Sequence, residues 1–325
     1  MKIAFQTDNI ETLKIATDSS LSLAKEALSR NFNVWFYTPE NLTYKKNNLF
    51  TIANQIIDIT NTNVIYRKAK RILLNDSDVL FIRQNPPFNM NYITTTYLLD
   101  LLKDTLIVNN PTAIRNFTEK LSILMFPELI PKTAVTSNLD EAKEFLNTNK
   151  SIVCKTLYEF GGNDIKKFDL ENSKDFLHHF QLLSQKSNTP LMLQKFIPSI
   201  TKGDKRIIIV DGKPIGALKK VPRKGTFISN LCAGGEAQKT TLTKRDIVIA
   251  QQVGASLLKH NIAFAGIDVI GKYLTEINVT SPTGLVAINK LSRLESKQKL
   301  ESIIWDTLLE KHKRAILLRQ SNNNQ

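Results

Sequence analysis

The chain has 325 residues, of which 42% are hydrophobic and 23% charged, and it carries a net charge of +14. This composition is typical of a globular protein and excludes a disordered chain. No stretch approaches the ~18 apolar residues of a membrane-spanning helix, and the first residues, MKIAFQTD, are too polar for a signal peptide. We therefore expect a soluble cytoplasmic protein with two domains or one large one.

The positive charge and the two cysteines indicate which classes of ligand the chain could bind. Lysines are spread along the whole chain, with only short clusters such as Tyr66–Arg71, and no nucleic-acid-binding motif accompanies them. A lysine-rich surface around a site for small anionic molecules explains this pattern better than nucleic-acid binding. Cys154 and Cys232 form no C-x-x-C pair, so neither a zinc site nor a redox pair is predicted. We expect small-molecule substrates, with no nucleic acid and no membrane as partner.

Strands and helices alternate over the first third of the chain. The predicted elements are a helix after Asp18, a helix over Tyr92–Leu102, and strands at Lys2–Gln6, Phe32–Tyr37, Asp78–Ile82 and Leu106–Val108. Such alternation predicts a parallel α/β sheet that binds ligands at the carboxyl ends of its strands. No G-x-G-x-x-G follows the first strand, so a dinucleotide site is not predicted.

A domain boundary is expected near the helix that begins at Pro111. We assign residues 1–118 to an N-terminal α/β domain, 119–318 to a second domain, and 319–325 to a frayed tail. The second domain mixes helices over Ser173–Leu183, Thr243–Lys259 and Leu294–Leu318 with strands at Ile152–Lys155, Leu191–Phe196, Arg206–Val210, Lys213–Lys219, Ala263–Ile270 and Tyr273–Thr280. Asp211-Gly212 predicts a tight hairpin turn between two of these strands.

The most informative stretch is FAGIDVIGKYLTEINVT, residues 264–280. Glu276 and Asn278 are two positions apart on a predicted strand, so their side chains share one face. A two-residue loop would pair Asp268 with Thr275, whereas a longer loop or a bulge would place Asp268 opposite Glu276. Carboxylate and amide oxygens suit Mg²⁺, and a cation would explain neighbouring carboxylates better than a solvated surface does.

Two lysines and two glycine pairs are candidate phosphate-binding groups. Lys120 is predicted on the helix after Pro111, and Lys155 ends an apolar strand. Each alone is more often a surface lysine, but a lysine at the end of a buried strand is a suitable point charge for phosphate. The pairs in YEFGGN and CAGGE could bring backbone N–H groups close to phosphate, a weak signal by itself.

Together these segments resemble bacterial glutathione synthetases from Lys2 to about Leu318. The resemblance is dense at residues 83–88, 108–121, 203–214, 230–236 and 266–283. It implies an α/β (α+β) ATP-grasp fold behind the N-terminal parallel-sheet domain. It also implies ATP and Mg²⁺ or Mn²⁺ as cofactors, and it makes a homo-oligomer an expectation by analogy.

The resemblance also implies roles for individual residues. It implies metal ligation by Asp268, Glu276 and Asn278, and catalysis by Arg206 and Lys220. For ATP it implies Lys120, Lys155, Gly161, Gly162, Gln194, Lys195, Phe196, Ile197, Asp204 and Asn278. Around the peptide substrate it implies Arg83, Arg206, Ser281, Pro282 and Thr283. The reaction so implied converts the cysteinyl carboxylate of γ-glutamylcysteine into an acyl phosphate, which the amine of glycine then displaces.

Three departures from the family pattern concern the lid and the substrate side. Lys220 stands where an arginine is expected, and Ile228-Ser229 replace the usual arginine and glycine of the large loop. Tyr158 and Glu159 replace the flexible start of the small glycine loop, and a charged pair is missing after residue 283. A working glutathione synthetase with an altered lid, a related ligase with another amine or acid, and an ATP-binding homologue with impaired ligation are therefore the hypotheses.

Overall fold

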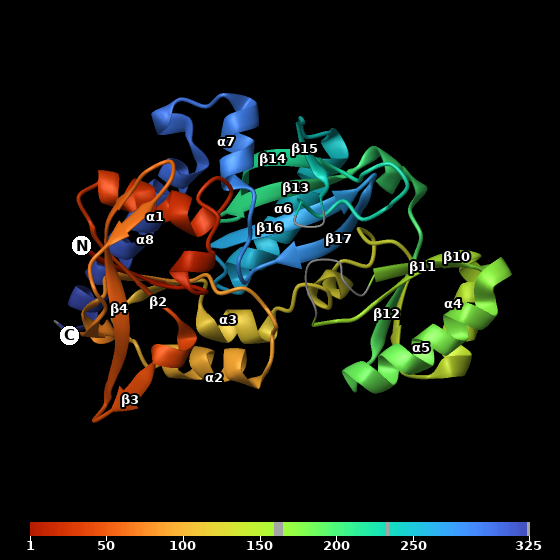
Figure 1. Cartoon of the computed structure of the whole chain (residues 1–325), viewed down its shortest axis with the longest axis horizontal. Coiled ribbons are helices and arrows are strands. Elements are labelled where there is room, and N and C mark those ends of the chain that lie inside the picture. The colour runs from red at the N-terminus through yellow and green to blue at the C-terminus, as the bar shows by residue number, and fades with distance from the viewer. Residues whose placement is uncertain (159–164, 232–233, 324–325) are drawn as a thin grey trace.

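The computed structural model describes residues 1–158, 165–231 and 234–323. Within these ranges the strands form three sheets, which lie one after another along the long axis of the molecule (Figure 1). The first sheet belongs to the N-terminal third, a four-stranded sheet lies at the opposite end, and a five-stranded sheet lies between them. The α/β character predicted from the sequence is confirmed.

The N-terminal sheet is built around parallel strands, as the alternation predicts. β1 (Lys2–Gln6) pairs in parallel with β2 (Asn33–Tyr37) and with β7 (Val79–Ile82), and β7 pairs in parallel with β8 (Leu106–Val108). The helices are α1 (Ser19–Ser29), α2 (Met90–Leu99) and α3 (Pro111–Asn116). Asp18 caps α1 by accepting the Leu21 N–H at 2.8 Å, which satisfies a donor that the helix itself cannot.

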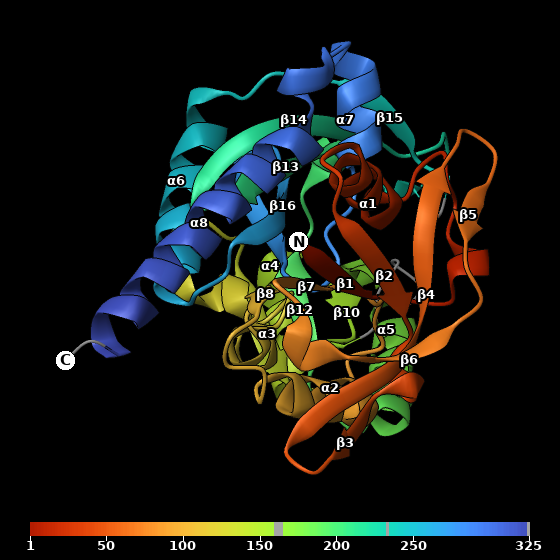
Figure 2. The same cartoon turned by 90° about the vertical axis from the view of Figure 1, so that its left-hand side faces the viewer.

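An antiparallel extension of this sheet was not predicted. It consists of β3 (Thr43–Lys45), β4 (Asn48–Ile59), β5 (Val64–Tyr66) and β6 (Lys70–Leu73), with β4 pairing antiparallel to β2. Its sequence signal is the alternation in β4, where Leu49, Thr51 and Ala53 are buried and Ile52 is exposed. The extension forms the edge of the sheet beyond β2 (Figure 2), and it contributes no residue to the site described below.

The four-stranded sheet has the order β11-β10-β12-β9 and is antiparallel in every pair. Its strands are β9 (Thr133–Thr136), β10 (Ser151–Lys155), β11 (Ile165–Asp169) and β12 (Leu191–Lys195). α4 (Leu139–Asn149) and α5 (Ser173–Ser187) lie side by side over it (Figure 1). Cys154 is fully buried in this core, as expected of a small apolar residue, whereas Cys232 lies outside the described residues.

The five-stranded sheet has the order β15-β14-β13-β16-β17. Its strands are β13 (Asp204–Val210), β14 (Lys213–Val221), β15 (Glu236–Lys239), β16 (Phe264–Ile270) and β17 (Tyr273–Asn278), and α6 (Lys244–Lys259) packs on it. The predicted turn at Asp211-Gly212 is confirmed, because φ is 46° at Asp211 and 74° at Gly212 while Val210 pairs with Lys213. Two positive φ values are what a two-residue hairpin requires.

The C-terminal region differs from the single helix predicted over Leu294–Leu318. It contains α7 (Leu285–Ser292) and then α8 (Leu300–Asn323), which runs past α1 (Figure 2). Trp305 of α8 is buried against Phe81, with ring centroids 5.3 Å apart, so α8 completes the core of the N-terminal sheet. The helix continues beyond residue 319, where we expected a frayed tail, and Arg319 donates to the Asp104 carbonyl at 2.9 Å.

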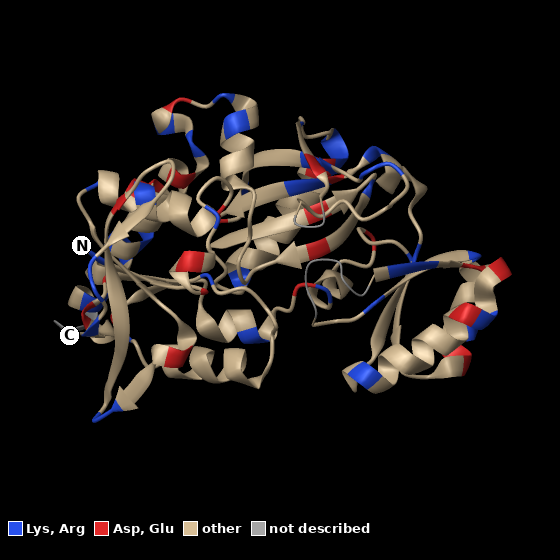
Figure 3. Ribbon diagram, in the orientation of Figure 1, with Lys and Arg blue, Asp and Glu red and all other residues tan. Residues whose placement is uncertain are grey.

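The charged residues are distributed over all three sheets and their helices (Figure 3). None of the described helices combines the length and the apolar character of a bilayer span. Several charged side chains are nevertheless buried, among them Lys155 on the four-stranded sheet and Lys220 and Asp268 on the five-stranded sheet.

Candidate active site

The hairpin of β16 and β17 settles the register that the sequence left open. Ile270 pairs with Tyr273, and a bulge between Asp268 and Val269 shifts the ladder so that Asp268 lies opposite Glu276. Gly266 pairs with Asn278 two positions further along. The three predicted metal ligands therefore gather on one face of the hairpin.

Asp268 is held by two cations. The Arg206 guanidinium, on β13, donates from Nε to Oδ1 at 2.6 Å and from Nη2 to Oδ2 at 2.9 Å, a bidentate pair. Lys220 Nζ, on β14, donates to Oδ2 at 3.1 Å. Burial alone would raise the pKa of Asp268, but these two cations hold it well below the ordinary range of a carboxyl group. Asp268 is thus a fixed carboxylate.

Lys220 links Asp268 to a second carboxylate. Its Nζ lies 2.8 Å from Asp204 Oδ2, because Asp204 and Lys220 are directly opposite on β13 and β14. Burial raises the pKa of Asp204, and the nearby Lys220 opposes that rise. Burial lowers the pKa of Lys220, but the attraction of Asp268 and Asp204 outweighs this effect. The pKa of Lys220 therefore lies above its ordinary value. A lysine here thus keeps the charge expected of an arginine at this position.

The hairpin has the donor set of a hard cation. Asn278 Nδ2 donates to the Gly266 carbonyl at 3.3 Å, which fixes the amide and keeps its oxygen as an acceptor. In the part of the chain that the structure describes, no group of three or more His, Cys, Asp or Glu residues is suited to a metal ion. Two carboxylates and one amide oxygen, with further ligands supplied by phosphate, fit Mg²⁺ rather than a soft metal.

Two buried lysines face the same region from other elements. Lys155 ends β10 as predicted and is 7% exposed, and burial lowers its pKa while Glu276 and Asp268 raise it. Lys120 is 5% exposed. It does not lie on the helix after Pro111, as predicted, because α3 ends at Asn116 and Phe117, with φ −123° and ψ 77°, leaves the helical conformation. Lys120 instead follows in the turn beyond that helix.

The predicted adenine hinge, residues 194–197, lies at the end of β12. Gln194 is buried and donates to Thr133 Oγ1 at 3.0 Å. The backbone N–H groups of Lys195 and Phe196 donate to the Lys132 and Ser151 carbonyls, both at 2.9 Å. These two N–H groups are already hydrogen-bonded within the protein. Only the other backbone groups of residues 194–197 remain to contact an adenine base.

Arg83 joins the N-terminal sheet to the loop after β17. Its Nη2 donates to the Pro282 carbonyl at 2.9 Å, its Nε donates to Ser20 at 3.1 Å, and Ser281 Oγ donates to the Arg83 carbonyl at 3.0 Å. Burial lowers the pKa of Arg83 to about 10. Arg83 Nη1 is buried and has no hydrogen-bond partner among the described residues, which points to an anionic ligand.

The loops predicted to cover the site are described only in part. Gly161 and Gly162 lie outside the described residues. The described residues between β14 and β15, 222–231 and 234–235, are here called the lid loop. Arg223 Nε donates to the Gly234 carbonyl at 2.8 Å, and the Phe227 ring meets the Phe196 ring of the hinge edge-on at 6.0 Å.

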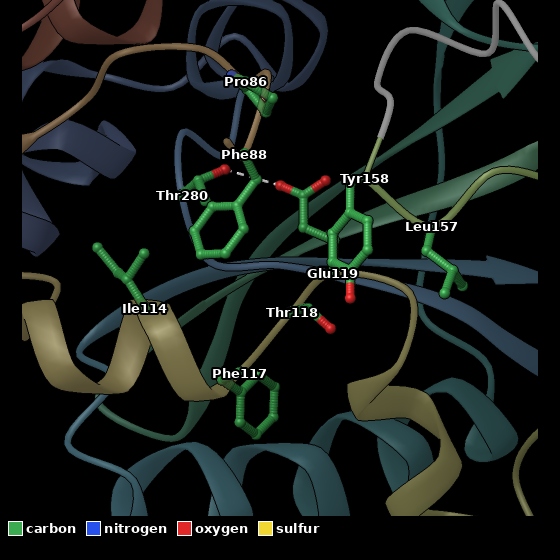
Figure 4. Close-up of a pocket in the computed structure, with 9 residues that line it drawn as sticks. All are labelled: Pro86, Phe88, Ile114, Phe117, Thr118, Glu119, Leu157, Tyr158 and Thr280. Carbon is green, nitrogen blue, oxygen red and sulfur yellow. Dashed lines mark hydrogen bonds between the residues drawn. The ribbon is translucent and has the colours of Figure 1, made fainter. Parts of the chain in front are cut away.

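A small pocket beside this centre was missed by sequence reasoning. Figure 4 shows Glu119 and Thr280 in it, with Thr280 Oγ1 donating to Glu119 Oε1 at 2.7 Å. The rings of Phe88 and Tyr158 lie on either side of the Glu119 carboxyl group in this view. Glu119 directly precedes Lys120, which was the available signal, but nothing local in the sequence indicates that Thr280 meets it.

Two family models match the chain. The model of the prokaryotic glutathione synthetase N-terminal domain matches residues 1–115, and that of the ATP-grasp domain of the same enzymes matches residues 119–293. The chain belongs to the prokaryotic glutathione synthetase family. It is accordingly an ATP-dependent carboxylate–amine ligase of the ATP-grasp type, as the resemblance implied.

Relatives and solved structures agree with the family assignment. The glutathione synthetase of Agrobacterium fabrum is 36% identical over 95% of this chain and 96% of its own length. That of Anaplasma centrale is 38% identical over 94% and 96%, respectively. The crystal structure of the D-cycloserine synthetase DcsG covers 96% of this chain and 100% of its own with a TM-score of 0.68 at 12% identity, which supports the fold alone. Enzymes of this family use ATP with Mg²⁺ or Mn²⁺.

Proposed function

We propose that the protein joins γ-glutamylcysteine to glycine, giving glutathione, ADP and phosphate. The observation that carries the proposal is the face formed by β13, β14, β16 and β17, where Asp268 lies opposite Glu276 and is held by Arg206 and Lys220. Side chains suited to a metal ion, of which Asp268 is buried, and buried lysines suited to phosphate meet at one junction, and such an arrangement has little structural use. Their conjunction fits phosphoryl transfer.

We also propose that the chain is divided into two domains near residue 118. Residues 1–118 form the N-terminal domain, and residues 119–318 form the ATP-grasp domain. The family models, which meet between residues 115 and 119, support this boundary. The core nevertheless extends across it, because α8 packs against β7 of the N-terminal sheet. The two domains are therefore expected to unfold together at this contact.

In the first proposed step, the cysteinyl carboxylate attacks the γ-phosphate of ATP and forms an acyl phosphate. Arg206, Lys120 and Lys155 neutralise the phosphates, and Gln194 to Ile197 and Asp204 hold the nucleoside. Bound Mg²⁺ would supply further charge neutralisation, held by Asp268, Glu276 and Asn278. In this structure Asp268 pairs with Arg206 and Lys220, which would share its carboxylate with the metal.

In the second proposed step, the uncharged amine of glycine attacks the acyl carbon, the C–N bond forms, and the bond from the acyl carbon to the phosphate oxygen breaks. The proton lost by the nitrogen passes to the departing phosphate. Arg83 holds the peptide substrate together with the loop at Ser281, Pro282 and Thr283. The lid loop covers the acyl phosphate and keeps water away from it until the amine arrives. Ile228 and Ser229 make this loop unlike the family pattern, so the lid is where amine or acid specificity would differ.

A turnover assay tests the proposal. The purified chain is incubated with ATP, Mg²⁺, γ-glutamylcysteine and glycine, and both tripeptide and ADP are quantified. We expect tripeptide formation that requires all four components. ADP with a different amine would indicate a related ligase, because the phosphorylating centre would then be intact. ATP binding without any ADP would indicate an ATP-binding homologue that has lost ligation, and it would overturn the proposal.

A further inference from the structure

The pocket around Glu119 has a volume of about 20 Å³, which is room for one group the size of a water molecule. Its walls are largely apolar, with aromatic rings from Phe88, Phe117 and Tyr158. Its polar end is the Glu119 carboxyl group with the Thr280 hydroxyl (Figure 4). A carboxylate among aromatic faces is a combination that recognises a primary ammonium group, since both the charge and the ring faces attract a cation.

Glu119 is half-buried at the polar end of the pocket. Burial raises the pKa of its carboxyl group and Glu276 adds to that rise, whereas the Thr280 hydroxyl, Lys120 and Arg206 oppose it. A cationic ligand beside the carboxylate would offset the cost of burying its charge.

The position of Glu119 ties the pocket to the reacting centre. The Glu119 carbonyl accepts the N–H of Ile277 at 3.0 Å, and Ile277 lies between Glu276 and Asn278 on β17. Lys120, the next residue, is one of the proposed phosphate lysines. An ammonium group bound here lies beside the place where the acyl phosphate forms.

We propose that Glu119, Thr280 and the rings of Phe88 and Tyr158 bind the amino group of the incoming glycine. The inference rests on the proposed function and specifies where its second substrate binds. The other ammonium group available is that of the γ-glutamyl residue. In γ-glutamylcysteine that group is separated from the reacting carboxylate by most of the dipeptide, whereas the glycine nitrogen must reach the acyl carbon itself.

Three variants test the assignment. Glu119→Gln removes the charge but keeps the shape and an acceptor for Thr280. Tyr158→Leu removes a ring at a partly exposed position while keeping an apolar side chain. Glu301→Gln is the matched control, because Glu301 is a buried carboxylate that accepts a hydrogen bond from Asn289 at 2.5 Å on α8, away from this pocket.

Glu119→Gln is expected to raise KM for glycine by about 10- to 100-fold, the range for a lost charge-assisted hydrogen bond. KM for ATP and for γ-glutamylcysteine should change far less. Tyr158→Leu should raise KM for glycine by about two- to fivefold, and Glu301→Gln should match the wild type. If Glu119→Gln fails to fold, the selective effect of Tyr158→Leu decides the question.

Hydroxylamine provides an uncharged nucleophile near neutral pH, which needs no anionic partner. The loss of kcat/KM in Glu119→Gln should therefore be at least about tenfold smaller with hydroxylamine, measured as hydroxamate, than with glycine. Equal losses with both nucleophiles, or a rise in KM for γ-glutamylcysteine instead of glycine, would overturn the assignment. Wild-type protein that forms neither product would overturn the proposed function, and the inference with it. A wild type that forms both, with both pocket variants unchanged, would overturn only the inference.

Discussion

The sheet face and the lid loop hold their residues in opposite ways. On the sheet face, Arg206, Lys220 and Asp268 sit on paired strands and are linked by hydrogen bonds of 2.6 to 3.1 Å. In the lid loop, Arg223 binds the Gly234 carbonyl and Phe227 meets Phe196, both at partly or fully exposed positions.

This difference separates two requirements of a ligase. Phosphoryl transfer needs charges fixed in place before the substrate arrives, and regular strands provide this. Closure over an acyl phosphate needs a segment that can move, and a loop in which most described side chains are exposed or half-buried suits that. Variants on the face should therefore change the rate of chemistry or the stability, whereas variants in the lid should change how well ATP hydrolysis is coupled to peptide formation.

The largest effect is expected from Glu276→Gln. The substitution keeps the shape of the side chain but removes the charge opposite Asp268, so a proposed metal ligand is lost. We expect kcat for ligation to fall about 1,000-fold, since several kcal/mol of charge stabilisation are removed from the transition state. The melting temperature and circular dichroism should stay close to wild type. Wild-type activity in this variant would show that Glu276 is not a ligand.

Lys155→Ala is expected to have the next largest effect. Lys155 is buried at the end of β10 and faces Glu276 and Asp268. Removing its charge should raise KM for ATP by about 10- to 100-fold. Lys166→Ala is a suitable control, because Lys166 is exposed on the adjacent strand β11. Equal KM values for the two variants would mean that Lys155 has no contact with phosphate.

Lys220→Met tests whether the ion pairs on the face of the five-stranded sheet stabilise the fold. It leaves Asp204 without its ion-pair partner, while Asp268 retains Arg206. Breaking a buried ion pair in this way should lower the free energy of unfolding by about 3 kcal/mol, which urea denaturation would measure. Lys220→Arg keeps the charge and should lose much less. If both variants lose the same amount, packing of the lysine stem rather than its charge stabilises the sheet.

The sheet face was the part of the molecule most accessible to sequence reasoning. Glu276 and Asn278 share a face because of strand periodicity alone, and the Asp211-Gly212 turn follows from residue type. The pairing of Asp268 with Glu276 could not be chosen, because a two-residue loop alone predicts Thr275 as the partner. The bulge between Asp268 and Val269 decides it, and a bulge depends on tertiary contacts that no local pattern specifies.

The pocket around Glu119 could not be predicted for a different reason. Phe88, Glu119, Tyr158 and Thr280 come from four separate segments, and only the meeting of the domains brings them together. One predicted helix boundary was wrong: Lys120 was placed on a helix that ends at Asn116. Nothing in FTEKL indicates that the backbone leaves the helical conformation at Phe117. Pairs of residues that meet across domains are thus the information that one sequence lacks.

The lid loop gives the smallest and most specific prediction. An arginine expected here by the family pattern would give an ionic anchor, but position 228 is an isoleucine that is only partly buried. The neighbouring Phe227 contacts Phe196 at the end of β12, so an apolar seat for the loop exists beside the hinge. An apolar contact of this size contributes about 1–3 kcal/mol to closure, comparable with an ionic latch. We therefore expect a hydrophobic latch that couples ATP hydrolysis to ligation.

Stoichiometry measures this coupling. With a sound latch, the wild type releases one phosphate per peptide bond even when glycine is scarce, because water does not reach the acyl phosphate. Phe227→Ala should then release excess phosphate at low glycine, by about two- to tenfold, while kcat at saturating glycine changes little. Ile228→Arg should not improve coupling. Excess phosphate from the wild type, reduced by Ile228→Arg, would show that closure is weak. The apolar contact would then not replace the arginine that the family pattern has at this position.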